Sequence, residues 1–198
     1  MSEIFEREPE WGNSLGRVNC TGYNGMKWYP LQLDDGSRSL IVLDHALAEV
    51  FEGHSFYMKS YIELAANATS HIMFVTPNTD VSVHFSYIIS SEAEAEINLY
   101  ESADGTTGSA IPYFNQNRTS ATTSGTIPYS MTTVTTAGTL ISSSITGSGR
   151  SSGGNDPSID ERIAKNNNKY IMRFKNNDGT ATRYINYFYN WHEHTDLD

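Results

Sequence analysis

Val81–Ser90 reads VSVHFSYIIS and carries the clearest structural signal in the chain. Positions 81, 83, 85 and 87 hold valine, phenylalanine or tyrosine, and serine or histidine occupies the positions between them. Successive side chains of a β-strand point to opposite faces of a sheet, so this alternation is typical of a strand with one buried face. We therefore expect a half-buried strand here.

Similar short runs of β-branched and aromatic residues lie on both sides of this stretch, separated by turn-forming Asn, Gly, Pro and Asp. They are His54–Leu64, Ser70–Thr76, Glu94–Glu101, Gly138–Thr146, Lys169–Lys175 and Thr182–Trp191. The sequence NNDG at Asn176–Gly179 predicts a hairpin turn between the last two runs. Ser39–Phe51 is apolar and favours a strand followed by a short helix. Together these runs predict an all-β fold, an antiparallel, jelly-roll-like β-sandwich.

The chain is expected to have two regions. Residues 1–43 show no sustained period of 2 or 3.6 residues, which predicts an extended N-terminal arm. Residues 44–198 form the predicted sandwich body, with long Ser/Thr/Gly-rich loops at 102–131 and 147–156. The arm contains aromatic residues that we expect to anchor it, to its own body or to a partner chain: Trp11, Tyr23, Trp28 and Tyr29.

Composition excludes several classes of partner. The formal net charge is −10 and there are only five lysines, so a nucleic-acid partner is not expected. No run approaches the roughly 20 apolar residues of a membrane span, and the acidic start MSEIFEREPEWG lacks the apolar core of a signal peptide. We therefore expect no membrane partner. The single Cys20 excludes an internal disulfide and a multi-cysteine zinc site.

Charged residues are nearly absent from the middle of the chain. Between Ala103 and Asn155 they are limited to Asp104, Arg118 and Arg150. A surface this poor in charge would limit the solubility of a free monomer, which favours coverage by a partner. Aromatic residues and arginine dominate binding hot spots, so we expect contacts there from Tyr113, Phe114 and Arg118.

Sites for catalysis are weakly indicated. Asp44 and His54 could join a serine in a triad, but no Gly-x-Ser-x-Gly segment exposes a nucleophile. Glu92, Glu94 and Glu96 alternate along one strand face, which we interpret as a charged strand edge in preference to a glycosidase site. We predict that the protein is not an enzyme.

The C-terminal sequence His192-Glu193-His194 offers a weak metal site. Residues i and i+2 of a strand share a face, so the two imidazoles could hold one metal ion, with Asp196 and Asp198 adding oxygens. Chain ends are poorly tethered, however, so a solvated polar terminus is the default interpretation. We expect no cofactor.

Several segments resemble virion structural proteins of tailed bacteriophages, within residues 44–194 and not in the arm. They are Asp44–His45, Glu52–Phe56 (EGHSF), Thr76–Thr79 (TPNT), Ile97–Glu101 (INLYE), Phe114–Arg118 (FNQNR), Thr136–Leu140 (TAGTL), Asn168–Phe174 (NKYIMRF) and Asn190–His194 (NWHEH). The last two are similar to the final β-hairpin of that group.

The resemblance implies a head decoration, or cement, protein that binds the major capsid protein on the outer surface of the capsid. It carries over no catalytic residues. Proteins of this group are often homotrimers, and this one would be made in the cytoplasm of the bacterial host. The alternatives are a tail fibre, spike or baseplate component that binds or cleaves host surface glycan, and an intracellular carbohydrate-binding module.

Overall fold

The computed structural model describes residues 32–33, 40–41, 45–147 and 161–195. The chain divides into two units, residues 1–44 with 197–198 and residues 45–196. In the first unit, β1 (Gln32–Leu33) pairs antiparallel with β2 (Leu40–Ile41). The four aromatic residues predicted to anchor the arm, Trp11, Tyr23, Trp28 and Tyr29, lie outside the described residues.

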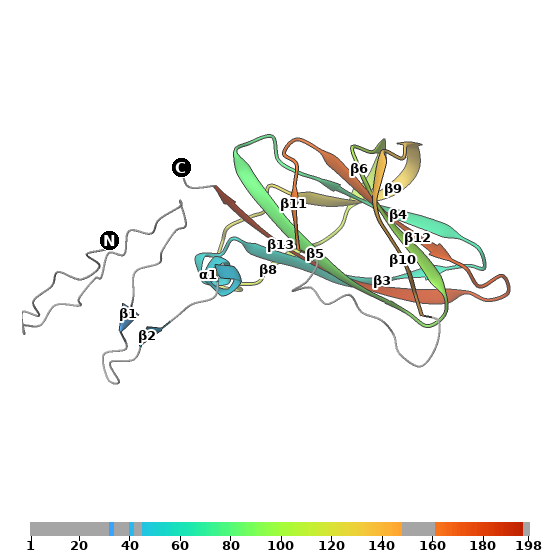
Figure 1. Ribbon diagram of the computed structural model, residues 1–198, viewed down its shortest axis with the longest axis horizontal. Coiled ribbons are helices and arrows are strands. Elements are labelled where there is room, and N and C mark those ends of the chain that lie inside the picture. Colours follow the sequence, from blue (N-terminus) through green and yellow to red (C-terminus); the bar gives the residue numbers. More distant parts are fainter. Residues whose placement is uncertain (1–31, 34–39, 42–44, 148–160, 196–198) are drawn as a thin grey trace, which may run out of the picture. The chain divides into compact units, whose positions relative to one another are not determined.

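The second unit is an all-β antiparallel sandwich, as predicted (Figure 1). Its described strands form a six-stranded sheet, in the order β10-β6-β12-β4-β9-β7, and a five-stranded sheet, β11-β5-β13-β3-β8. Their bounds are β3 Ser55–Leu64, β4 Thr69–Val75, β5 Val81–Ser91, β6 Ala95–Glu101, β7 Asp104–Ala110, β8 Phe114–Asn115, β9 Ile127–Thr136, β10 Thr139–Thr146, β11 Arg162–Ala164, β12 Lys169–Asn176 and β13 Arg183–Thr195.

The strand pairing has jelly-roll connectivity. Eight of the described strands, β3 to β6 and β10 to β13, pair in a nested order in which the first pairs with the last. The four pairs are β3–β13, β4–β12, β5–β11 and β6–β10. Folding such a nested strip over itself places alternate strands in opposite sheets, which is the double-sheet jelly roll. Strands β7 to β9 form an insertion between its fourth and fifth strands.

The hairpin predicted at Asn176–Gly179 is wrong. Strand β12 pairs with β4 and β6, and β13 pairs with β3 and β5, so the turn joins the two sheets. Turn residues specify where the chain reverses, and the partners of the flanking strands are set by non-local pairing. Strands β12 and β13 both bury one face in the core, and they do so from opposite sheets.

Part of the long loop predicted at 102–131 is strand. It contains β7, β8 and the start of β9, because threonine-rich edge strands need little apolar surface and resemble loops in composition. On the outer face of the six-stranded sheet, Met131 and Val134 of β9 pack against the buried Met73 and Ile171. Of the second predicted loop, 147–156, only Gly147 is among the described residues.

The main core lies between the two sheets. Trp191 of β13 is 2% exposed and stacks on Phe56 of β3, with 6.0 Å between ring centroids. Helix α1 (His45–Glu52) packs against β3 and β13 and ends at Gly53, whose φ is +81°. The N–H groups of Gly53 and His54 donate to the carbonyls of Val50 and Glu49, which is the Schellman arrangement that ends a helix.

Candidate functional site

The three predicted loop contacts occupy different environments. Tyr113 is half-buried, with its ring against Phe56 and Trp191 and its hydroxyl donating to the carbonyl of Ser124 at 3.3 Å. Phe114 of β8 is 45% exposed, and the guanidinium carbon of Arg118 lies 5.0 Å from its ring centroid. Phe114 and Arg118 therefore present a joint surface, whereas Tyr113 mainly supports the core.

Phe114 belongs to a row of rings on the outer side of the five-stranded sheet. Its ring is 5.8 Å from that of Tyr57, which is 6.2 Å from Phe188, and Tyr61 meets Tyr184 edge-on at 5.6 Å. We call these five residues the aromatic face. A shallow pocket on it is lined by Tyr57, Gln116, Arg118 and Phe188. Flat rings beside amide and guanidinium donors suit the binding of sugars or of another protein.

The end strands of the two sheets carry exposed aliphatic side chains. Leu140 and Ile145 of β10 are 51% and 62% exposed, and Ile163 of β11 is 67% exposed. Within the described residues, β10 ends the six-stranded sheet and β11 ends the five-stranded one. Since β10 contacts β5 and β4 contacts β3, both end strands lie on the same side of the sandwich. Leu140 and Ile145 pair with Tyr100 and Glu96 on the outer face of the six-stranded sheet, whereas Ile163 pairs with His84 on the outer face of the five-stranded sheet. We call Leu140 and Ile145 the aliphatic edge.

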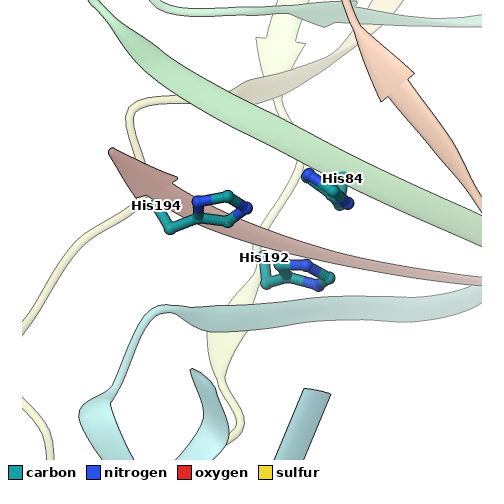
Figure 2. Close-up of side chains that lie close together, drawn as sticks. All are labelled: His84, His192 and His194. Atoms are coloured by element: carbon teal, nitrogen blue, oxygen red, sulfur yellow. The ribbon is translucent and has the colours of Figure 1, made fainter. Parts of the chain in front are cut away.

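His192 and His194, the weak metal candidates, lie beside a third histidine. His84 of β5 is the direct ladder partner of His192 on β13, and His194 lies two residues further along β13 (Figure 2). Val83 on β5 and Trp191 on β13 point into the core, so the three imidazoles, at even-numbered positions, lie on the outer face of the five-stranded sheet. One ligand nitrogen from each ring lies within 4.8 Å of the others.

The carboxylate of Glu161 contacts two of these imidazole rings. Oε1 of Glu161, which directly precedes β11, lies 3.2 Å from Nδ1 of His84 and 3.5 Å from Nε2 of His192. We call these four residues the histidine cluster. The local sequence places the two C-terminal histidines on one strand face, but it does not predict His84 and Glu161. These two residues come close only because β5, β11 and β13 lie side by side, and the sequence does not reveal that pairing. Asp196 and Asp198 lie outside the described residues.

His54, the histidine considered for nucleophilic catalysis, contacts carboxylates of the preceding helix. Nδ1 of His54 lies 3.3 Å from Oε2 of Glu49, which is 3% exposed, and 3.6 Å from Oε2 of Glu52. Both carboxylates lie on α1, so these contacts are local to the end of the helix. Asp44, the acid considered for a triad, lies outside the described residues.

The glutamates considered for glycoside cleavage do not mark a strand edge, so that interpretation is wrong. Glu96 is on β6, which lies between β10 and β12 in the sheet. Its carboxylate is 3.7 Å from the guanidinium of Arg173 on the neighbouring strand, and Glu94 accepts a hydrogen bond from the side chain of Asn177. Glu92 follows the end of β5. Non-local pairing made β6 an interior strand, which the local sequence could not reveal.

Comparisons with known proteins do not identify a family for this chain. No family model, curated protein or solved structure matches the chain. Among the described helices, none has the length and apolar character needed to cross a membrane.

Proposed function

We propose that this protein is a non-enzymatic structural protein of a tailed-phage virion, a decoration protein that binds the outer surface of the capsid. The observation that supports this most directly is the aliphatic edge. Leu140 and Ile145 project from an end strand whose own sequence, TLISSSIT, contains no charge. Soluble proteins usually protect such strands with lysine or other charged side chains, because an unprotected edge invites association.

An uncharged edge is well suited to a protein interface. Charged residues are depleted from the cores of interfaces, whereas aliphatic and hydroxyl side chains lose little on desolvation. The opposite end strand, β7, reads DGTTGSA and carries one charge, Asp104. Its ladder with β9 is interrupted by several register shifts, which discourage further strand pairing. The β10 side is therefore the better candidate for the contact with capsid subunits.

Fold and charge also support this role. Jelly rolls occur in viral capsid proteins, lectins and cupins, so the fold supports a virion role by analogy alone. The net charge of −10 suits the outer surface of a head, away from packaged DNA. A homotrimer that bridges capsid subunits would add interfaces of about 1,600 Å² each.

A second candidate function rests on the aromatic face. Tyr61 and Tyr184 are 61% and 40% exposed and lie beside each other, and Gln116 donates to the side chain of Asn190 at 2.6 Å on the same sheet. Asn190 is the ladder partner of Tyr57, so these amides lie beside the Tyr57 ring, and Tyr61 and Tyr184 lie further along the same face. Sugar rings stack on aromatic surfaces that have hydrogen-bonding groups nearby. This observation favours a tail fibre, spike or baseplate component that binds host surface glycan.

Immunogold labelling of intact virions tests the location. Label spread over the head is expected for a decoration protein, and label confined to the tail would favour the glycan-binding role. Absence of label from particles would contradict both virion roles.

Co-sedimentation of the purified protein with phage heads that lack it tests the contact surface. Ile145→Lys is expected to weaken head binding at least tenfold, because it places a charge on the aliphatic edge. Tyr184→Ser, also at an exposed position but on the aromatic face, serves as the matched control and is expected to bind heads normally. If Tyr184→Ser abolishes binding to host glycan while Ile145→Lys leaves head binding intact, the second function replaces the first.

A further inference from the structure

The histidine cluster combines donors that are distant in sequence. His84 lies on β5, His192 and His194 lie on β13, and Glu161 directly precedes β11. Because β11, β5 and β13 are consecutive in one sheet, the fold brings the donors to the same outer surface. Figure 2 shows the three imidazoles side by side, and the carboxylate of Glu161 contacts two of them. Among the described residues, this is the group that offers three imidazole ligands within 4.8 Å of one another.

The spacing of the rings matches a shared metal ion. With Zn–N distances of about 2.0–2.1 Å, imidazoles that share a tetrahedral Zn²⁺ hold their ring centres about 5 Å apart. The ring centroids of His84 lie 4.6 Å from His192 and 4.8 Å from His194, and those of His192 and His194 are 5.8 Å apart. Small side-chain rotations are enough to direct one nitrogen of each ring to a common point.

The carboxylate of Glu161 lies at the spacing expected of a fourth ligand. At metal–ligand distances of about 2.0–2.1 Å, neighbouring ligand atoms of a tetrahedral Zn²⁺ are about 3.3 Å apart. Oε1 of Glu161 is 3.2 Å from the His84 nitrogen and 3.5 Å from the His192 nitrogen. A carboxylate in this position also offsets part of the charge of the cation.

The environment favours an ordered site. The side chains of His84 and His192 are 20% and 9% exposed, so the imidazoles are sheltered while Glu161, at 47%, keeps access to solvent. All three histidines come from paired strands, whose register holds His84 opposite His192. Ligands on rigid elements lose little conformational freedom on binding a metal ion.

We infer that His84, His192, His194 and Glu161 bind one first-row divalent transition-metal ion, with Zn²⁺ the best fit. Three imidazoles and one carboxylate suit Zn²⁺, Co²⁺ and Ni²⁺, whereas Mg²⁺ and Ca²⁺ prefer oxygen ligands. The bound ion ties the end of β13 to β5 and to the start of β11. The site is independent of the proposed virion role and gives the last strand a cross-link.

Metal binding by the full-length chain, freed of metal with a chelator, tests the inference. Isothermal titration with ZnCl₂ is expected to give one site per chain. At free Zn²⁺ about 100-fold above the dissociation constant, the midpoint of thermal unfolding should rise by about 5–10 °C. Mg²⁺ and Ca²⁺ should give no shift. Co²⁺ should produce the strong visible absorption that is typical of tetrahedral coordination.

Single substitutions locate the site. His84→Gln and His194→Gln are expected to weaken Zn²⁺ binding at least 100-fold, and Glu161→Gln about tenfold. The matched control is His71→Gln, because His71 lies on β4 in the other sheet and should leave the titration unchanged. Circular dichroism and the unfolding midpoint without metal show whether each variant folds.

Each contrary result would overturn the inference. Wild-type protein that neither binds Zn²⁺ nor gains thermal stability would show that the cluster is held by imidazole–carboxylate contacts alone. Folded His84→Gln and His194→Gln variants that bind as tightly as His71→Gln would show the same for these residues. Binding that is lost in His54→Gln instead would place the ion at the end of α1.

Discussion

Asn176 is expected to be one of the largest polar contributors to stability in the sandwich. Its side chain is 1% exposed and lies at the turn that joins the two sheets. Its amide donates to the carbonyls of Leu64, Ala65 and Ala181 at 3.1, 3.0 and 2.9 Å, and its oxygen accepts the N–H of Asp178 at 2.9 Å. The residue therefore holds together the end of β3, the end of β12 and the start of β13.

Asn176→Ala removes this network and leaves buried carbonyl groups without their donor. The amide has two protons, so its contacts amount to about two hydrogen bonds, and the oxygen adds a third. At about 1 kcal/mol for each bond, the free energy of unfolding should fall by about 3 kcal/mol. For a chain of this size, the unfolding midpoint should fall by about 6–12 °C.

Urea unfolding followed by tryptophan fluorescence measures this change, since Trp191 is in the core. Asn177→Ala is the matched control, because the neighbouring asparagine makes one exposed side-chain contact, with Glu94 at 3.2 Å. The control should change the free energy of unfolding by less than about 0.5 kcal/mol. If Asn176→Ala lies within about 0.5 kcal/mol of Asn177→Ala, the hydrogen bonds do not stabilise the fold as argued.

Three further predictions concern single groups. Tyr189 is fully buried, and burial raises the pKa of its hydroxyl well above the usual range. That hydroxyl has no hydrogen-bond partner among the described residues, so Tyr189→Phe should stabilise the protein by about 1 kcal/mol in urea unfolding. A loss of stability would show that the hydroxyl is hydrogen-bonded. Gly147 has a φ of +86°, and a Cβ there would overlap the carbonyl oxygen of Ala93. Gly147→Ala should therefore lower the free energy of unfolding by at least about 2 kcal/mol. Gly179 has room for a Cβ, so Gly179→Ala should change the free energy of unfolding by less than about 0.5 kcal/mol. Hydrogen bonds from the backbone and side chain of Thr180, and then from Arg183, hold the pKa of Asp178 well below its usual range. Because the folded-state pKa is depressed, this stabilisation is present above the unfolded-state pKa near 4 and is lost as the pH falls below it, so Asp178→Asn should flatten the acid side of the stability profile; an unchanged profile would contradict this.

The local pattern of the chain predicts much of its secondary structure. Alternation in Val81–Ser90 and the apolar runs around it place strands close to the observed bounds, and the strand and short helix favoured in Ser39–Phe51 correspond to β2 and α1. These features depend on neighbours in sequence, because burial of one strand face requires a period of two residues. The pattern does not predict β7, because its Thr and Gly residues leave no apolar stripe.

Pairing between distant strands required the tertiary structure. The turn at Asn176–Gly179 has hairpin residues, yet the strands beside it lie in different sheets. Likewise, His192 and His194 share a strand face by local rules, but the register that sets His84 opposite His192, more than a hundred residues away, follows from packing of the whole core. Local sequence specifies which face a side chain takes, and only the burial of both sheets together selects the partner strand and register.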